Sequence, residues 1–176
     1  GDRVEVYDID EPARPVLLAE HNVDGEIRIL DHYRARLLVW LAPGEGMKPY
    51  DPLRLVILTM ERPMLAESGR LSLESLGVWQ RGFTVVGNYM ACLNYEFRQG
   101  TNILTFDLQS LPARLVPARG RREFVGEDAS ITALGESLLL TDGDGALVTF
   151  SPDDAGGLDL RGAVDTLGAP HGLASD

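Results

Sequence analysis

Val6-Tyr7-Asp8-Ile9-Asp10-Glu11-Pro12-Ala13-Arg14-Pro15-Val16 decides the fold of this chain, because parts of it recur along the sequence. A related phrase reads Phe106-Asp107-Leu108-Gln109-Ser110-Leu111-Pro112-Ala113-Arg114-Leu115-Val116. Between them, Arg62-Pro63-Met64-Leu65-Ala66-Glu67 echoes Arg14-Pro15-Val16-Leu17-Leu18-Ala19-Glu20, and Val148-Thr149-Phe150-Ser151-Pro152 is a further echo. The echoes are spaced by about fifty residues, and self-similarity at such a period predicts a repeat architecture.

Short strands separated by turns make up most of the sequence. Val4-Glu5-Val6-Tyr7 alternates apolar and polar residues, as a half-buried strand does, and similar short runs follow along the chain. The ten prolines and nineteen glycines fall mostly between these runs. Glycines also interrupt the segments that a helical face would need, and each costs about 1 kcal/mol inside a helix. The sequence therefore predicts an all-β protein.

Strand pattern alone fits a β-sandwich as easily as a β-propeller. The repeat favours the propeller, because each blade is the same four-stranded sheet, and a blade takes about 40–50 residues. We therefore expect one propeller segment over 1–176, with blades at about 1–46, 47–100, 101–145 and an incomplete one at 146–176. Closed propellers have about 4–8 blades. A protein partner, or the remainder of the same chain, is expected to complete the propeller.

The first phrase resembles the blade opening V-x-V-Y-D-I-x-x-P-x-x-P-x-L of bacterial secreted and lipid-anchored β-propeller proteins, the LVIVD-type and C-terminal beta-propeller families. Asp24-Gly25-Glu26-Ile27-Arg28 and Arg36-Leu37-Leu38-Val39-Trp40 are similar to the continuation of such a blade. In these families the aspartate after the aromatic residue caps the turn and the proline shapes the loop. The resemblance thus implies an extracellular or cell-envelope location, with the cytoplasm as the alternative. It also implies structural turn roles for Asp8, Asp107, Pro12 and Pro112.

The composition disfavours two classes of partner. The formal net charge is −11 and the isoelectric point is near 4.6. Such a protein repels phosphate backbones and anionic membrane surfaces, so we expect no nucleic-acid partner. No apolar run reaches the length of a membrane span, and we expect no membrane insertion.

Asp142-Gly143-Asp144-Gly145 is the main candidate for a metal site. Calcium prefers six to eight oxygen ligands, and alternate carboxylates in a glycine loop supply some of them. Asp142 and Asp144 are therefore weak calcium candidates, to which Asp153-Asp154 could contribute. The favoured interpretation is an ordinary hairpin turn, because the third acidic position and the distal glutamate of a full calcium loop are missing. We otherwise expect no cofactor.

The remaining candidates are weak. Arg119, Arg121 and Arg122 form the one cationic cluster of the sequence, either a solvated loop or a docking loop for an acidic partner. Trp40 and Trp79 are expected at comparable blade positions, filling the space between blades. Cys92 is expected to be a small buried apolar residue. His21, His32 and His171 are too scattered to indicate a metal centre.

These observations leave three functional hypotheses open. The first is a non-catalytic propeller module that mediates protein–protein interaction or assembly. The second is a propeller enzyme, such as a hydrolase or lyase, with its site at the axial mouth, where residues from several blades meet without forming a linear motif. The third is a cytoplasmic scaffold subunit. The sequence assigns no catalytic residue.

Overall fold

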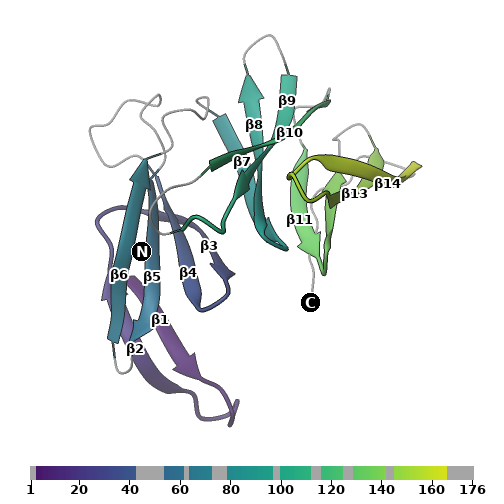
Figure 1. Cartoon of the computed structure of the whole chain (residues 1–176). Coiled ribbons are helices and arrows are strands. Elements are labelled where there is room, and N and C mark those ends of the chain that lie inside the picture. Colours follow the sequence, from purple (N-terminus) through teal and green to yellow (C-terminus); the bar gives the residue numbers. More distant parts are fainter. Residues whose placement is uncertain are drawn as a thin grey trace. The chain divides into compact units, whose positions relative to one another are not determined.

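The computed structural model is all-β, as the sequence predicts (Figure 1). It describes residues 3–42, 54–61, 64–72, 79–96, 100–111, 116–124, 129–141 and 145–165. Fourteen strands and no helix occur in these ranges, and the strands form four antiparallel sheets. The chain divides into two compact units, unit 1 (Gly1–Ser75) and unit 2 (Leu76–Asp176).

Unit 1 contains a two-stranded sheet and a four-stranded sheet (Figure 1). Its strands are β1 (Arg3–Asp8), β2 (Val16–Asn22), β3 (Ile27–Tyr33), β4 (Arg36–Leu41), β5 (Arg54–Glu61) and β6 (Met64–Ser72). The pair β1–β2 forms the small sheet, and β3–β4–β5–β6 follow one another in chain order in the large one. Val4 and Ala19 of the small sheet share a buried cluster with Val39, Leu58 and neighbouring residues of the large sheet, so the two sheets pack face to face.

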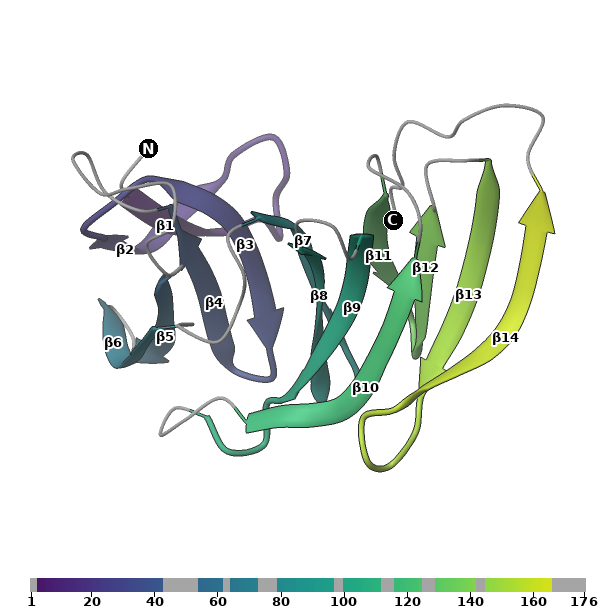
Figure 2. The same ribbon diagram turned by 90° about the horizontal axis from the view of Figure 1, so that it is seen from above.

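Unit 2 consists of two complete four-stranded sheets (Figure 2). Its strands are β7 (Trp79–Val86), β8 (Tyr89–Glu96), β9 (Gly100–Asp107), β10 (Val116–Phe124), β11 (Ser130–Leu134), β12 (Ser137–Thr141), β13 (Ala146–Pro152) and β14 (Leu158–Asp165). Strands β7–β10 and β11–β14 again follow chain order within their sheets. One cluster joins the sheets and includes Leu93, Ile103, Leu138 and Phe150. Burying each such side chain contributes about 1.5–3 kcal/mol.

The inner strands β4 and β8 of two four-stranded sheets are buried on both faces. In β4, Val39 and Leu41 belong to the cluster beneath β1–β2, while Leu38 and Trp40 alternate with them and are equally buried. In β8, Met90 alternates with buried residues of the other face in the same way. Successive side chains of a strand point to opposite faces, so both faces of β4 and of β8 are buried.

The last sheet, β11–β14, is covered on one face only. Its inner face carries Leu138, Leu140 and Phe150 of the unit 2 cluster. On its outer face, Leu134 and Val164 are 54% and 64% exposed. Leu147 lies directly opposite Val164 in the register and therefore shares the outer face. This sheet ends with an open apolar surface.

Each pairing of a third with a fourth strand contains a β-bulge. We number the strands of each four-stranded sheet from first to fourth in chain order. The first strands are then β3, β7 and β11, and the fourth strands are β6, β10 and β14. The extra residues lie in the fourth strand: Ser68 in β6, Arg161 in β14, and in β10 two of the three residues 118–120, which stand opposite Thr105 alone. The small sheet has the same irregularity, with Leu18 as the extra residue in β2. Bulges bend a strand and increase its twist.

The sheets differ in phase from the blades expected from the sequence. The expected boundary at 46/47 separates β4 from β5, the one at 100/101 separates β8 from most of β9, and the one at 145/146 separates β12 from β13. Both strands of each of these three pairs belong to one sheet. The cause is that strand grouping depends on pairing between distant residues, which a local phrase does not specify. Strand β8 is the second strand of its sheet.

Candidate functional site

The recurring phrase corresponds to the hairpins that join third and fourth strands. Asp8 pairs with Val16 across β1–β2, and Asp107 pairs with Val116 across β9–β10. The echo beginning at Arg62 corresponds to the same place, because Glu61 pairs with Met64 across β5–β6. In the last echo, Pro152 pairs with Leu158. Strands β1 and β2 are therefore equivalent to a third and a fourth strand.

Asp8 and Asp107 accept hydrogen bonds within these hairpins, as turn residues do. The backbone N–H of Asp10 donates to Asp8 Oδ1 at 3.0 Å, and that of Gln109 donates to Asp107 Oδ1 at 2.8 Å. Both are aspartate turns, in which the carboxylate serves an amide that the sheet ladder does not reach. Pro12 lies in the first turn, whereas Pro112 lies outside the described residues.

Asp153 organises the corresponding hairpin of the last sheet. Its Oδ1 accepts hydrogen bonds from the backbone N–H groups of Ala155 at 2.8 Å and Gly157 at 2.7 Å. A Cβ atom added at Gly157 would lie 2.5 Å from Asp153 Oδ2, so a side chain there would force the Asp153 carboxylate to shift. The sequence offered Asp153 as a contributor to a calcium site. In the structure, one of its oxygens is engaged in the turn.

Two hydroxyl groups of β8 and β9 hold this hairpin in place. Tyr89 Oη donates to the carbonyl oxygen of Asp154 at 2.7 Å, and Thr105 Oγ1 donates to that of Gly156 at 2.6 Å. Thr105 is 1% exposed. Burial, followed by the charges of neighbouring aspartates including Asp107, raises the pKa of Tyr89. The neutral phenol that donates this hydrogen bond is therefore favoured. We call these two hydrogen bonds, from Tyr89 and from Thr105, the clasp. Sequence reasoning missed it.

The β1–β2 hairpin borders an open hollow of about 320 Å³. It is lined by Asp8, Asp10, Glu11, Arg14 and Val16. The N–H of Arg14 donates to the carbonyl oxygen of Glu11 at 2.8 Å and closes the turn. Over the part of the chain that the structure describes, no three histidine, cysteine or acidic residues are grouped to hold a metal ion.

The calcium and cationic candidates have different outcomes. Asp142 and Asp144 lie outside the described residues, so the calcium hypothesis stays a prediction. Arg119, Arg121 and Arg122 were expected on a loop, but their backbone belongs to strand β10. Arg121 and Arg122 pair with Leu104 and Ile103, and residue 119 lies in the bulge. The cluster therefore follows the edge strand of its sheet, and a docking role for it stays a prediction.

The tryptophans occupy different positions, contrary to the expectation from the sequence. Trp40 lies in β4, the second strand of its sheet, and is 1% exposed. Trp79 opens β7, which is a first strand. The distance between them in the sequence suggested equivalence only because the blade phase was misplaced. Cys92 is fully buried, and burial strongly raises the pKa of its thiol, so the side chain behaves as the expected apolar residue.

The other displaced pKa values arise from local partners. A salt bridge of 2.8 Å joins Arg70 to Glu67 on β6, which lowers the pKa of Glu67 and raises that of Arg70. A hydrogen bond to Glu5 raises the pKa of Tyr7. His21 Nδ1 lies 3.1 Å from the carbonyl oxygen of Leu65 and links β2 to β6. These groups have structural partners, and the enzyme hypothesis stays a prediction.

Comparison with known proteins adds no family assignment. No protein-family model and no curated protein matches the chain. Among the described residues, no helix is long and apolar enough to cross a membrane.

Proposed function

We propose that this chain is a segment of a β-propeller that works by binding other protein segments, through sheets that continue the stack. One observation carries the proposal. The inner strands β4 and β8 are buried on both faces, whereas the outer face of β11–β14 exposes Leu134 and Val164. Sheets with two apolar faces are made to be covered on both sides, as the blades of a propeller are.

The contact between equivalent strands supports the same proposal. In unit 2, first strand β11 contacts first strand β7, and fourth strand β14 contacts fourth strand β10. In unit 1, fourth-strand equivalent β2 contacts fourth strand β6. Repeated blades bring equivalent strands into contact, because each blade packs face to face on its neighbour. The resemblance of the first phrase to propeller blades agrees with it.

The test is association of the purified full chain. Sedimentation velocity over a hundredfold range of concentration should show assemblies larger than the monomer. The double variant Leu134→Glu/Val164→Glu should weaken them, because it places two charges on the open outer face. A double variant with the same charge change at exposed polar positions, Asn22→Glu/Gln109→Glu, should behave like the wild type. A wild-type chain that stays monomeric and binds no other chain would contradict the proposal.

The compartment is a separate part of the proposal and rests on the resemblance alone. We propose export to the cell envelope or beyond. Fractionation of the native host cell tests it, and recovery of the protein in the cytoplasm would contradict it and favour the scaffold hypothesis.

A further inference from the structure

Leu30 and Ile131 are equivalent residues with different surroundings. Each lies four positions before the first residue of a tight turn, Arg34 or Gly135, whose φ angles are 56° and 59°. Leu30 pairs with Val39 and Ile131 pairs with Leu140, and both of these second-strand partners are fully buried core residues. Yet Leu30 is 51% exposed, whereas Ile131 is partly buried against the unit 2 cluster.

The first strand of the neighbouring sheet covers Ile131. Strand β11 contacts β7, and a Cβ atom added at Gly82 of β7 would lie 3.0 Å from Ile131 Cγ2. Ile131 therefore packs against β7 at a position where the absence of a side chain makes room for it. By the same reasoning, an aliphatic residue at the position of Leu30 would be covered by a neighbouring first strand that has a small residue at the position of Gly82.

In unit 1 the strand that would cover Leu30 is absent from the described residues. The small sheet there consists of a third and a fourth strand, and within the part of the chain that the structure describes β1 pairs with β2 alone. Strand β2 contacts β6, and Val4 of β1 shares the buried cluster with Val56 of β5 and Val39 of β4, so β1 lies on the side of β2 that leads toward the middle of the large sheet. Paired strands are about 4.8 Å apart. Val39 of β4 is already fully buried, so strands added beside β1 would extend toward β3, and so over Leu30.

We propose that the edge of β1 that has no partner among the described residues binds a β-hairpin that supplies the first and second strands of this sheet. The inference rests on the proposed function, because it names the occupant of one binding surface. The hairpin's second strand pairs antiparallel with β1 and is apolar on both faces, as β4 and β8 are. Its first strand has a small residue that faces Leu30, as Gly82 faces Ile131. Main-chain hydrogen bonds to the edge and side-chain packing on the face act together.

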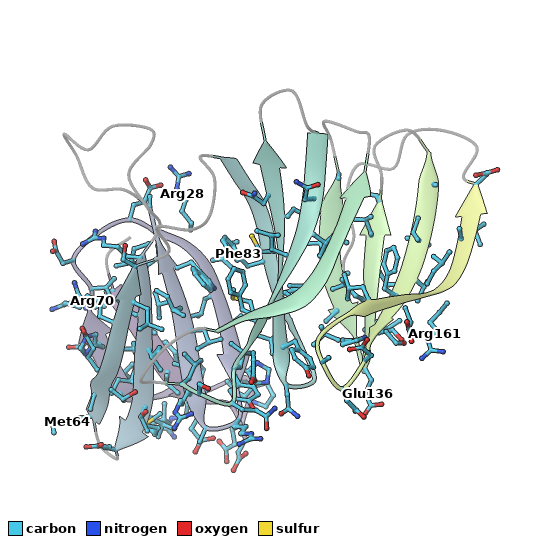
Figure 3. The ribbon with its side chains drawn as sticks, turned by 45° about the horizontal axis from the view of Figure 1, so that its top comes forward. Arg28, Met64, Arg70, Phe83, Glu136 and Arg161 are labelled. Carbon is cyan, nitrogen blue, oxygen red and sulfur yellow. The ribbon has the colours of Figure 1, made fainter. Side chains whose placement is uncertain are left out.

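The probe is the chain's own equivalent of that hairpin, a synthetic peptide of residues 79–96 with Cys92→Ala. Calorimetric titration into the full chain should show saturable binding, and hydrogen exchange should show new protection of amides in β1. Leu30→Glu should weaken binding by about tenfold or more, since the carboxylate would be buried without a partner. Met64→Glu is the matched control, because Met64 is 63% exposed and points outward from the start of β6 (Figure 3).

Covalent attachment of the hairpin removes any dependence on peptide solubility. Residues 79–99 placed directly before residue 1 would supply both strands together with the chain's own link from a second to a third strand. The extended chain should melt at least about 4 °C higher than the wild type. Leu30→Glu should abolish this gain, while costing the wild-type chain little because the side chain is half exposed there.

Several outcomes would overturn the inference. Absence of both peptide binding and the melting gain would do so, as would equal binding by the Leu30→Glu variant or protection outside β1. Self-association lost on Leu30→Glu, with no hairpin binding, would mean that a second copy covers this edge instead. If the hairpin does not bind but the chain still associates through Leu134 and Val164, this inference fails while the proposed function stands. If the chain neither associates nor binds the hairpin, both fail.

Discussion

Unit 1 and unit 2 use the same strand arrangement but differ in how completely it is covered. In unit 2, two four-stranded sheets cover one another, and Ile131 finds a glycine to pack against. In unit 1, a two-stranded sheet lies on a four-stranded one and leaves Leu30 half exposed. The comparison shows that the stable element of this protein is a pair of stacked sheets rather than a single sheet, because each sheet has two apolar faces to cover.

The largest expected effect separates the two units. Phe150 is fully buried between the sheets of unit 2, so Phe150→Ala should cost about 3–5 kcal/mol. Residue-level hydrogen exchange should show lost protection in β7–β14 and retained protection in β1–β6. The control Leu160→Ala should have little effect, since Leu160 is 49% exposed. Equal loss of protection in β1–β6 would mean that the chain unfolds as one unit.

The second prediction compares how the hairpins are held. Thr105→Val keeps the shape of the side chain but leaves the buried carbonyl oxygen of Gly156 without its donor. The expected loss is about 1–3 kcal/mol, measured by denaturant unfolding. Thr149→Val, at a partly exposed position of the same unit, should be nearly neutral. A loss at Thr105 no larger than at Thr149 would show that the clasp contributes nothing to stability.

The third prediction uses the turns between first and second strands. Gly87 and Gly135 have φ angles of 58° and 59°, and at the equivalent place unit 1 has Arg34, with φ 56°. Left-handed backbone disfavours a side chain, while the stacking of Arg34 on Tyr33 offsets part of that cost. Arg34→Gly should therefore stabilise unit 1 by about 1 kcal/mol in thermal unfolding.

Gly87→Ala provides the converse control. It should destabilise unit 2 by backbone strain alone, because no atom lies within 4 Å of the added Cβ. If Arg34→Gly lowered stability, the contacts of the arginine would outweigh the strain of its backbone.

The smallest effect concerns the turn aspartates. Asp8→Ala and Asp107→Ala each remove one hydrogen bond to a turn amide, and should lower stability by about 0.5–1 kcal/mol without changing binding. Asp153→Ala should cost more, because its Oδ1 accepts two such bonds. Thermal unfolding and association assays on the same three variants are the measurement. An unchanged melting temperature with loss of association would assign the aspartate to binding instead.

Local chemistry explains what could be predicted from the sequence. Turn chemistry is local, because aspartate and proline act within a few residues of their own position. All-β structure followed from alternation and glycine spacing in the same way. The grouping of strands into sheets was misplaced, since β4 joins β5 through pairing that no local phrase encodes. For the same reason Trp79 was placed in the wrong kind of strand.

The candidate surfaces were harder to predict than the fold. The clasp joins Tyr89 to Asp154 and Thr105 to Gly156, and these partners are far apart in the sequence. Exposure of Leu30 depends on which strand lies above it, which only the stacking reveals. The composition of the 153–157 turn could have indicated Asp153, because Pro-Asp-Asp-Ala-Gly-Gly is rich in turn residues.

The bulges of the fourth strands determine which sheet edges are suited to pairing with a further strand. An edge that bends out of the ladder is a poor template for a further strand, and every four-stranded sheet has such an edge at β6, β10 or β14. In the small sheet the extra residue belongs to β2, so the irregularity does not fall on β1. Under the proposal above, strand addition is thus directional: the regular edge of β1 accepts a further strand, while the bent edges of β6, β10 and β14 disfavour one.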